Sequence, residues 1–200
     1  MTSAFAQSVP TLNRESRALL QGALADFDAK RFDEALAKLQ EAEKTSPDDP
    51  FVINLIGAAY TKKKEYGTAL SYFEKSLSKD PNFFPAQFNI AELDFLQTNY
   101  PAALERFNKM LERDPRNELL QFKIFLTLLQ MNRNEEAAKV LAKIPYPGNT
   151  PAWYYAQAAW ESKRGNVKKA MEYVSGARYI FGPKTLMFDE TFRDLAIKLR

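Results

Sequence analysis

The chain has 200 residues, with 28 Lys and Arg against 25 Asp and Glu, which leaves a net charge of +3. It contains neither Cys nor His, which excludes disulfide frameworks, thiolate or imidazole metal sites, Cys nucleophiles and His general bases. The hydrophobic content of 46% fits a folded chain with a substantial core, and the small net charge does not indicate a nucleic-acid partner.

Residues 1–12 predict a flexible N-terminal tail. Ala4-Phe5-Ala6 matches the small-residue pattern cut by signal peptidase, but the charged and apolar regions that precede such a site are missing. Two interpretations stay open: the tail is the remnant of a signal-peptide cleavage region in a bacterial-type exported or periplasmic protein, or it is an ordinary chain end in a cytoplasmic one. No stretch approaches the roughly 20 apolar residues of a transmembrane segment.

A repeat organises the sequence after the tail. Pro47, Pro81 and Pro115 stand 34 residues apart, each directly after a Ser or an Asp. The same step joins a small and a large series, which are Ala35, Ala69, Ala103 and Ala137, and Leu39, Phe73, Phe107 and Leu141. Because proline cannot continue a helix, the recurrent prolines predict turns at the repeat ends.

This pattern resembles the tetratricopeptide repeat (TPR), a unit of about 34 residues folded as two antiparallel helices. Residues 50–83 match it best, through Ile53, Ile56, Gly57, Tyr60, Tyr66, Ala69, Phe73, Ser76 and Pro81. The resemblance implies an all-α fold, a right-handed α-α superhelix or solenoid of about five helix-turn-helix repeats plus a C-terminal capping helix. The recurrent small residues let paired helices approach closely, and the large ones fill the space between successive pairs.

The resemblance places the solenoid domain at residues 13–182, with repeats at about 16–49, 50–83, 84–117, 118–150 and 151–183. The fourth repeat departs from the pattern, because Pro145 precedes the expected end of its second helix. We therefore expect a short second helix and a rigid loop over residues 145–150. That loop is either a boundary or bend between repeats or an ordinary loop substitution.

Residues 184–200 predict one further helix after Gly182-Pro183. Its apolar stripe consists of Phe188, Phe192, Leu195 and Leu199. The remaining positions carry both acidic and basic residues, which favours a helix that caps the last hairpin over one that lies on a membrane surface.

The sequence indicates no catalytic, cofactor-binding or metal site. The acidic pairs Asp48-Asp49 and Glu135-Glu136 lie near expected helix starts, where carboxylates stabilise the helix dipole. The run Lys62-Lys63-Lys64 lies at an expected helix end, and no glycine-rich phosphate-binding motif occurs. We therefore expect a protein that is not an enzyme and that needs no cofactor.

The resemblance further implies that the first helix of each repeat lines a concave groove for partners. The corresponding positions, called here the groove residues, are Phe51, Asn54, Phe88, Asn89, Glu92, Phe95, Phe122, Lys123, Leu126 and Tyr155. Part of this apolar surface is expected to pack between neighbouring first helices, and the rest would mark a binding site. A family subtype that grips a C-terminal carboxylate is disfavoured, because only Asn89 and Lys123 match its pattern.

The leading hypothesis is a non-enzymatic scaffold or adaptor that binds a protein or peptide segment in this groove. Two alternatives stay open. One is a structural subunit that self-associates through the groove or a terminal hairpin into a homo-oligomer. The other is a cytoplasmic secretion-type chaperone of the same fold, which shields an apolar segment of an exported protein.

Overall fold

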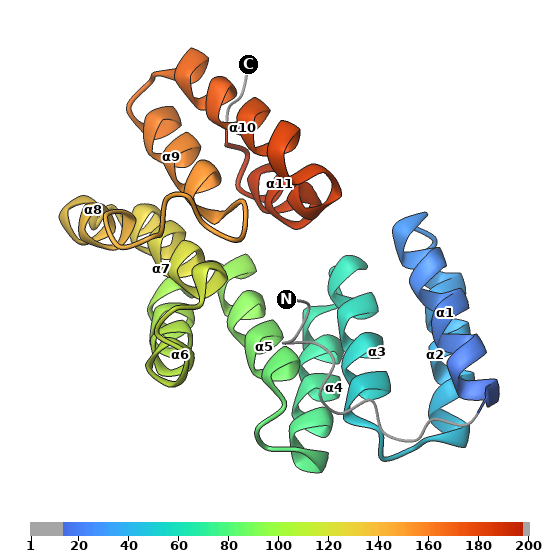
Figure 1. Ribbon diagram of the computed structural model, residues 1–200. Coiled ribbons are helices and arrows are strands. Elements are labelled where there is room, and N and C mark those ends of the chain that lie inside the picture. The colour runs from blue at the N-terminus through green and yellow to red at the C-terminus, as the bar shows by residue number, and fades with distance from the viewer. Residues whose placement is uncertain (1–13, 198–200) are drawn as a thin grey trace. The chain divides into compact units, whose positions relative to one another are not determined.

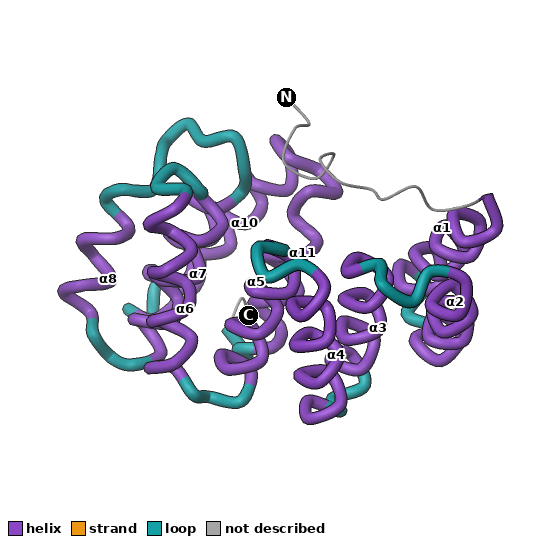
Figure 2. Tube along the Cα trace, turned by 90° about the horizontal axis from the view of Figure 1, so that it is seen from below, coloured by secondary structure: helices purple, strands orange, loops and turns teal. Residues whose placement is uncertain are grey.

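The computed structural model describes residues 14–197, and every regular element in that range is a helix (Figures 1 and 2). The first helices of the pairs are α1 (Arg14–Asp28), α3 (Pro50–Lys62), α5 (Phe84–Leu96), α7 (Glu118–Gln130) and α9 (Ala152–Lys163). The second helices are α2 (Phe32–Thr45), α4 (Tyr66–Lys79), α6 (Tyr100–Arg113), α8 (Asn134–Leu141) and α10 (Val167–Phe181). A short 3-10 helix, η1 (Gly182–Thr185), leads into α11 (Leu186–Asp194). The expected all-α class of helix-turn-helix repeats is confirmed.

Two sequence motifs fall outside the described residues. Ala4-Phe5-Ala6 precedes residue 14, and Leu199 of the C-terminal stripe follows residue 197. Among the helices of residues 14–197, none combines the length and the apolar character that crossing a bilayer requires.

The turn inside each helix pair contains one residue in the left-handed backbone region. These residues are Lys30, Lys64, Thr98, Asn132 and Gly165, with φ between 58° and 83°. In each turn the next backbone N–H returns to a carbonyl five residues earlier, as from Arg31 to Asp26 at 2.8 Å. This arrangement satisfies carbonyls that the helix end leaves open. Only Gly165 is a glycine, so a search for glycine at helix ends finds one of these turns.

Small residues let the helices of a pair pack closely. Ala35, Ala69 and Ala103 are fully buried. Gly57 of α3 faces the ring of Phe73 on α4, and a Cβ atom at Gly57 would lie 2.6 Å from that ring. The small series of the 34-residue repeat therefore lies at the contacts inside the pairs.

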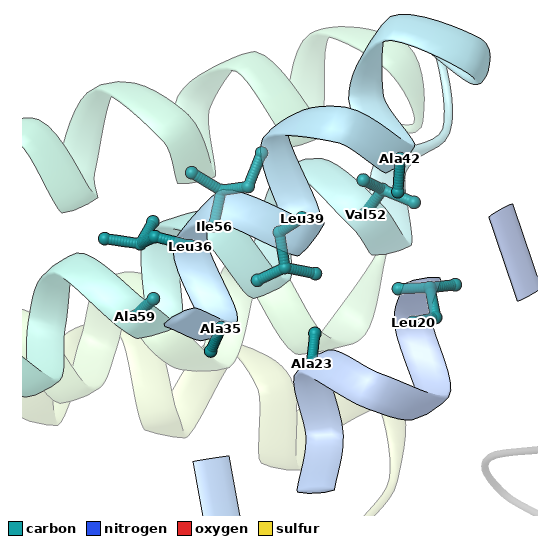
Figure 3. Packing of buried hydrophobic residues seen from close by; sticks show 9 residues of the cluster. All are labelled: Leu20, Ala23, Ala35, Leu36, Leu39, Ala42, Val52, Ile56 and Ala59. Carbon is teal, nitrogen blue, oxygen red and sulfur yellow. The ribbon is translucent and has the colours of Figure 1, made fainter. Parts of the chain in front are cut away.

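Larger side chains connect one pair to the next. Figure 3 shows a cluster in which α1 contributes Leu20 and Ala23, and α3 contributes Val52, Ile56 and Ala59. The α2 side chains of the cluster are Ala35, Leu36, Leu39 and Ala42. Because α2 contacts both α1 and α3, burial of this cluster ties the first repeat to the second.

The chain divides into two compact units, Met1–Leu93 and Asp94–Arg200. In the first unit α1 packs on α2, α2 on α3 and α3 on α4. In the second, α6 packs on α7, α7 on α8 and α9, and α9 on α10. The loop over residues 145–150 therefore lies inside the second unit and is not the boundary between the two.

The fourth repeat has the short second helix that its proline predicts. Helix α8 has 8 residues, whereas α6 has 14. The loop after it is held by the buried carboxylate of Glu118, which accepts hydrogen bonds from the backbone N–H groups of Asn149 at 2.8 Å and Thr150 at 2.9 Å. The Thr150 hydroxyl donates to the same carboxylate at 2.5 Å. Helix α7 thus anchors the loop that leads to α9.

Candidate functional site

The groove residues fall into two sets, one in each compact unit. The first set lies on α3 and on α5 up to residue 93, and consists of Phe51, Asn54, Phe88, Asn89 and Glu92. The second set lies on α5 from residue 94, on α7 and on α9, and consists of Phe95, Phe122, Lys123, Leu126 and Tyr155.

The first set is partly open to solvent. Phe51, Phe88, Asn89 and Glu92 are each half-buried. Asn54 is buried, and its side-chain oxygen accepts a hydrogen bond from the Asn89 amide at 2.9 Å. The Phe88 ring stacks on that of Phe84, with 6.0 Å between centroids. These contacts hold an aromatic and amide surface across α3 and α5.

Helix α3 presents Phe51 because its first turn is capped. The Asp49 carboxylate accepts hydrogen bonds from the backbone N–H groups of Phe51 at 2.8 Å and Val52 at 3.2 Å. Pro50 occupies a first-turn position, where its missing N–H costs nothing. Phe51 also packs against the two apolar clusters of the first unit, so part of its ring serves the core.

The second set is buried throughout. Phe95, Phe122, Lys123, Leu126 and Tyr155 are each no more than 2% exposed. Helix α11 covers three of these five through direct contacts. The groove in this unit is therefore filled by the chain itself.

Two phenylalanine rings of α11 make the apolar part of this contact. The Phe188 centroid lies 5.0 Å from that of Phe122 and 5.2 Å from that of Tyr155. The Phe192 centroid lies 5.0 Å from that of Tyr155, and both phenylalanines are 3% exposed. Tilted and edge-on ring pairs at these separations add stabilisation beyond the area they bury.

Polar groups fix the register of α11. Asp189 accepts a hydrogen bond from the Tyr155 hydroxyl at 2.5 Å, and the Arg178 guanidinium donates to both of its carboxylate oxygens, at 2.8 Å and 3.3 Å. The Lys123 ammonium donates to the Thr191 hydroxyl at 3.1 Å and lies 5.7 Å from the centroid of the Phe95 ring. Donors from α7, α9 and α10 therefore meet α11.

The protonation states suit this arrangement. Burial, together with the hydrogen bond to Asp189, raises the pKa of Tyr155 above its ordinary value. The hydrogen bond to Asp189 likewise raises the pKa of Arg178. At neutral pH the phenol is therefore a neutral donor and the guanidinium a permanent cation.

The expected cap meets the last hairpin at only part of its surface. Helix α11 contacts α9 through Tyr155 and α10 through Arg178, and it also reaches α7 of the preceding repeat. Elsewhere α10 keeps large apolar side chains exposed, including Tyr179 at 92%. The sequence pattern identified the buried stripe of Phe188 and Phe192 but not the surface that buries it.

The charged motifs of the sequence have structural partners. Asp48 forms an ion pair with Lys79 at 2.6 Å, and Lys63 one with Asp33 at 2.7 Å. Glu136 forms a two-pronged pair with Arg133. Within residues 14–197 no three acidic side chains lie together in an arrangement that could hold a metal ion.

Comparison with known proteins agrees with this architecture. Residues 94–160 match the family model described as tetratricopeptide repeat. No curated protein resembles the sequence closely enough to count as a relative.

Solved structures share the fold over most of the chain. A tetratricopeptide repeat protein from Parabacteroides merdae has a TM-score of 0.74 at 17% identity and covers 90% of this chain and 71% of its own. A thermophilic TPR protein of Thermus thermophilus has a TM-score of 0.72 at 18% identity, over 90% of this chain and 99% of its own. The pilF protein of Pseudomonas aeruginosa has a TM-score of 0.66 at 17% identity, over 92% and 86%. At such identities the likeness establishes the fold.

Proposed function

We propose that this chain, a tetratricopeptide-repeat protein, is a non-enzymatic scaffold that binds a segment of a partner protein on its groove residues. The fold generally serves protein–protein interaction. The finer assignment, to the groove residues, is the proposal.

One observation carries it, which is the seat of α11. In the second unit the groove residues already hold a helical segment, through ring contacts from Phe122 and Tyr155 and a hydrogen bond from Lys123. A surface that accepts a helix of its own chain has the shape and chemistry to accept one from another chain.

The first set supplies the accessible part of the surface. Phe51 and Phe88 are half-buried rings on neighbouring first helices, and the hydrogen-bonded pair Asn54 and Asn89 holds polar groups beside them. Aromatic anchors usually dominate an interface, each costing about 2 kcal/mol or more on truncation, whereas exposed charge pairs contribute under about 1 kcal/mol. Binding here is expected to be apolar in origin.

The test is capture of native partners by the intact chain, followed by affinity measurement with the captured protein. Phe88→Ala is expected to weaken binding at least tenfold, since about 1.4 kcal/mol corresponds to a factor of ten. Tyr179→Ala, which removes an exposed ring from α10, is the matched control and is expected to bind normally. Raising salt from low to physiological strength is expected to change affinity little.

The opposite pattern would contradict the proposal. Normal binding by Phe88→Ala, combined with steep salt dependence, would move the site to a charged surface such as the one around Lys63. Circular dichroism of each variant separates lost binding from lost folding.

A second candidate is self-association, and exposed side chains near the C-terminus favour it. Four large apolar residues lie exposed over residues 179–187, namely Tyr179, Ile180, Leu186 and Met187. Clustered exposed apolar residues are typical of interaction surfaces. If this surface joins two copies, light scattering after size exclusion will show a dimer that Ile180→Glu converts to monomer, whereas a monomer at all concentrations removes this candidate.

A further inference from the structure

Helix α11 is joined to the rest of its unit differently from the paired helices. The backbones of α9 and α10 pack closely along their length, whereas α11 approaches closely only η1, the segment that leads into it. Its contacts with α7 and α9 are made by side-chain ends, chiefly the rings of Phe188 and Phe192. It is a short element of 9 residues with two apolar anchors.

The other side of α11 faces solvent. Leu186 is 67% exposed and Met187 42% exposed, while Phe188 and Phe192 are buried. The two buried rings are four positions apart and therefore share one helix face. This is how a bound amphipathic helix lies in a groove, with one face used for anchoring.

The surface under α11 also selects an acidic position. Asp189 directly follows the first anchor ring and receives hydrogen bonds from Tyr155 and Arg178, which come from different helices. A carboxylate held by a guanidinium and a phenol is a charge-assisted contact of defined geometry. An amide or an alkyl group at this position would lose the ion pair with Arg178.

We propose that α11 is an intramolecular ligand of the groove residues in the second unit, and that the partner for this surface is a helical segment with the same side-chain order. That order is an aromatic residue, an acidic residue directly after it, and a second aromatic residue four positions after the first. The partner segment displaces α11 and takes over its contacts with Phe122, Tyr155 and Arg178. This inference rests on the proposed function and adds to it the class of partner and the device that controls access.

The tether sets the strength of the competition. A segment joined to its site by a few residues has an effective concentration on the order of 1 mM. A free segment therefore binds the intact chain weakly, and its apparent affinity rises as the fraction of sites left open by α11 rises. Removing the anchors of α11 is expected to expose the site without altering it.

The first experiment uses the full chain and a fluorescent peptide with the sequence of residues 183–197. Binding to a Phe188→Ala/Phe192→Ala chain is expected to be at least about tenfold tighter than binding to the wild type. The matched control is Leu186→Ala/Met187→Ala, which changes two exposed residues of the same helix and is expected to bind like the wild type. A peptide with both phenylalanines changed to alanine is expected not to bind.

The acidic position is tested by a paired change. Arg178→Gln, introduced into the Phe188→Ala/Phe192→Ala chain, is expected to weaken binding of the original peptide about tenfold, because the charged contact with Asp189 is lost. It is expected to leave nearly unchanged the weaker binding of a peptide that carries Asn at the position of Asp189. Equal losses for both peptides would overturn the assignment of an acidic position.

A second measurement remains decisive if the double alanine chain fails to fold. The sequence has no cysteine, so Ser175→Cys on α10 and Arg193→Cys on α11 place two labels on exposed positions at defined sites. A saturating amount of peptide is expected to lengthen the distance between the labels. An unchanged distance would overturn the inference.

Other occupants give different results. If the distance lengthens with protein concentration in the absence of peptide, the occupant is α11 of a second copy, and the proposal of a foreign partner is overturned. Capture of a partner that depends on Phe88, together with no displacement of α11, would remove this inference and leave the proposed function standing. Displacement of α11 by peptide without any effect of Phe88→Ala on partner capture would restrict the binding site to the second unit.

Discussion

Single residues control how closely neighbouring helices approach, and the recurring small positions of this chain show why their size matters. Ala35 and Ala69 are fully buried between paired helices, and Gly57 lies against a ring. Protein interiors are close-packed, so one added methyl group at such a contact displaces its neighbours.

Gly57→Ala is expected to destabilise the protein. The added Cβ would lie 2.6 Å from the Phe73 ring and 3.1 Å from the Ala69 carbonyl oxygen, and overpacking typically costs about 1–3 kcal/mol. That cost exceeds the gain of up to about 1 kcal/mol that alanine brings to a helix interior. Chemical denaturation measures the difference. Gly67→Ala on α4 is the control, because nothing lies within 4 Å of its added Cβ. Equal stability of the two variants would contradict the close contact.

Asp26 gives the first repeat a defined response to acid. This buried carboxylate accepts hydrogen bonds from Lys38 and from Arg31 at 2.5 Å and 3.0 Å. The hydrogen bonds from Lys38 and then Arg31 lower its pKa below the ordinary value, which is about 3.9. Because the folded pKa is the lower one, the stabilisation is complete above the ordinary pKa and is lost as pH falls through the folded pKa.

We therefore expect Asp26→Asn to lower the melting temperature at pH 7, and the gap to the wild type to close as pH falls below about 4. Melting temperatures from pH 7 to pH 2 measure this. Asp28→Asn, an exposed change on the same helix, is expected to track the wild type. A gap for Asp26→Asn that stays constant down to pH 2 would show that the ion pairs contribute no pH dependence.

At the scale of elements, the turns within the helix pairs recur as regularly as the helices. Lys30, Lys64, Thr98 and Asn132 follow one another at the repeat distance of 34 residues, each with positive φ. The conformation is imposed by the need to satisfy the carbonyls at the end of the first helix, whichever residue occupies the position. The cost of that conformation depends on the residue, since β-branched side chains adopt it rarely.

Thr98→Asn is expected to stabilise the protein by about 0.5–1 kcal/mol, because Asn tolerates the left-handed region better than a β-branched residue. Asn132 already occupies the equivalent turn one repeat later. The midpoint of urea unfolding measures the gain. Gly165→Ala, at φ 83°, is expected to do the reverse and lower stability by about 1 kcal/mol. A loss of stability in Thr98→Asn would show that the threonine makes a compensating contact.

At the scale of the whole molecule, stability comes from packing between neighbouring helices within each compact unit. The contacts follow chain order, as from α6 to α7 and from α9 to α10, and the only long reach described within a unit is that of α11 back to α7. Such nearest-neighbour packing needs no central ion or cofactor.

Removal of metal ions is therefore expected to leave the protein unchanged. Chelation with EDTA should alter neither the helical circular dichroism signal nor the melting temperature, because a structural metal needs a cluster of ligands and residues 14–197 contain none. A melting temperature lower by several degrees after chelation would reveal a site outside those residues or one shared between molecules.

The sequence by itself determined the helix pairs and their close contacts. A spacing of 34 residues between prolines, small residues and large residues depends only on local rules for helices and turns, and the positions that it picked out, such as Ala69 and Phe73, are buried. The short α8 followed in the same way from the position of Pro145, because proline ends a helix locally.

Only the tertiary structure decided how the groove residues are used. An apolar stripe specifies that a face will be buried but not what buries it. The stripe of α11 could equally have covered the outer side of α10, yet it lies on Phe122 and Tyr155, where Lys123 meets Thr191 across 68 residues of sequence. No local periodicity carries a contact of that separation, so the division between the half-open set on α3 and α5 and the filled set beneath α11 arises only when the chain folds.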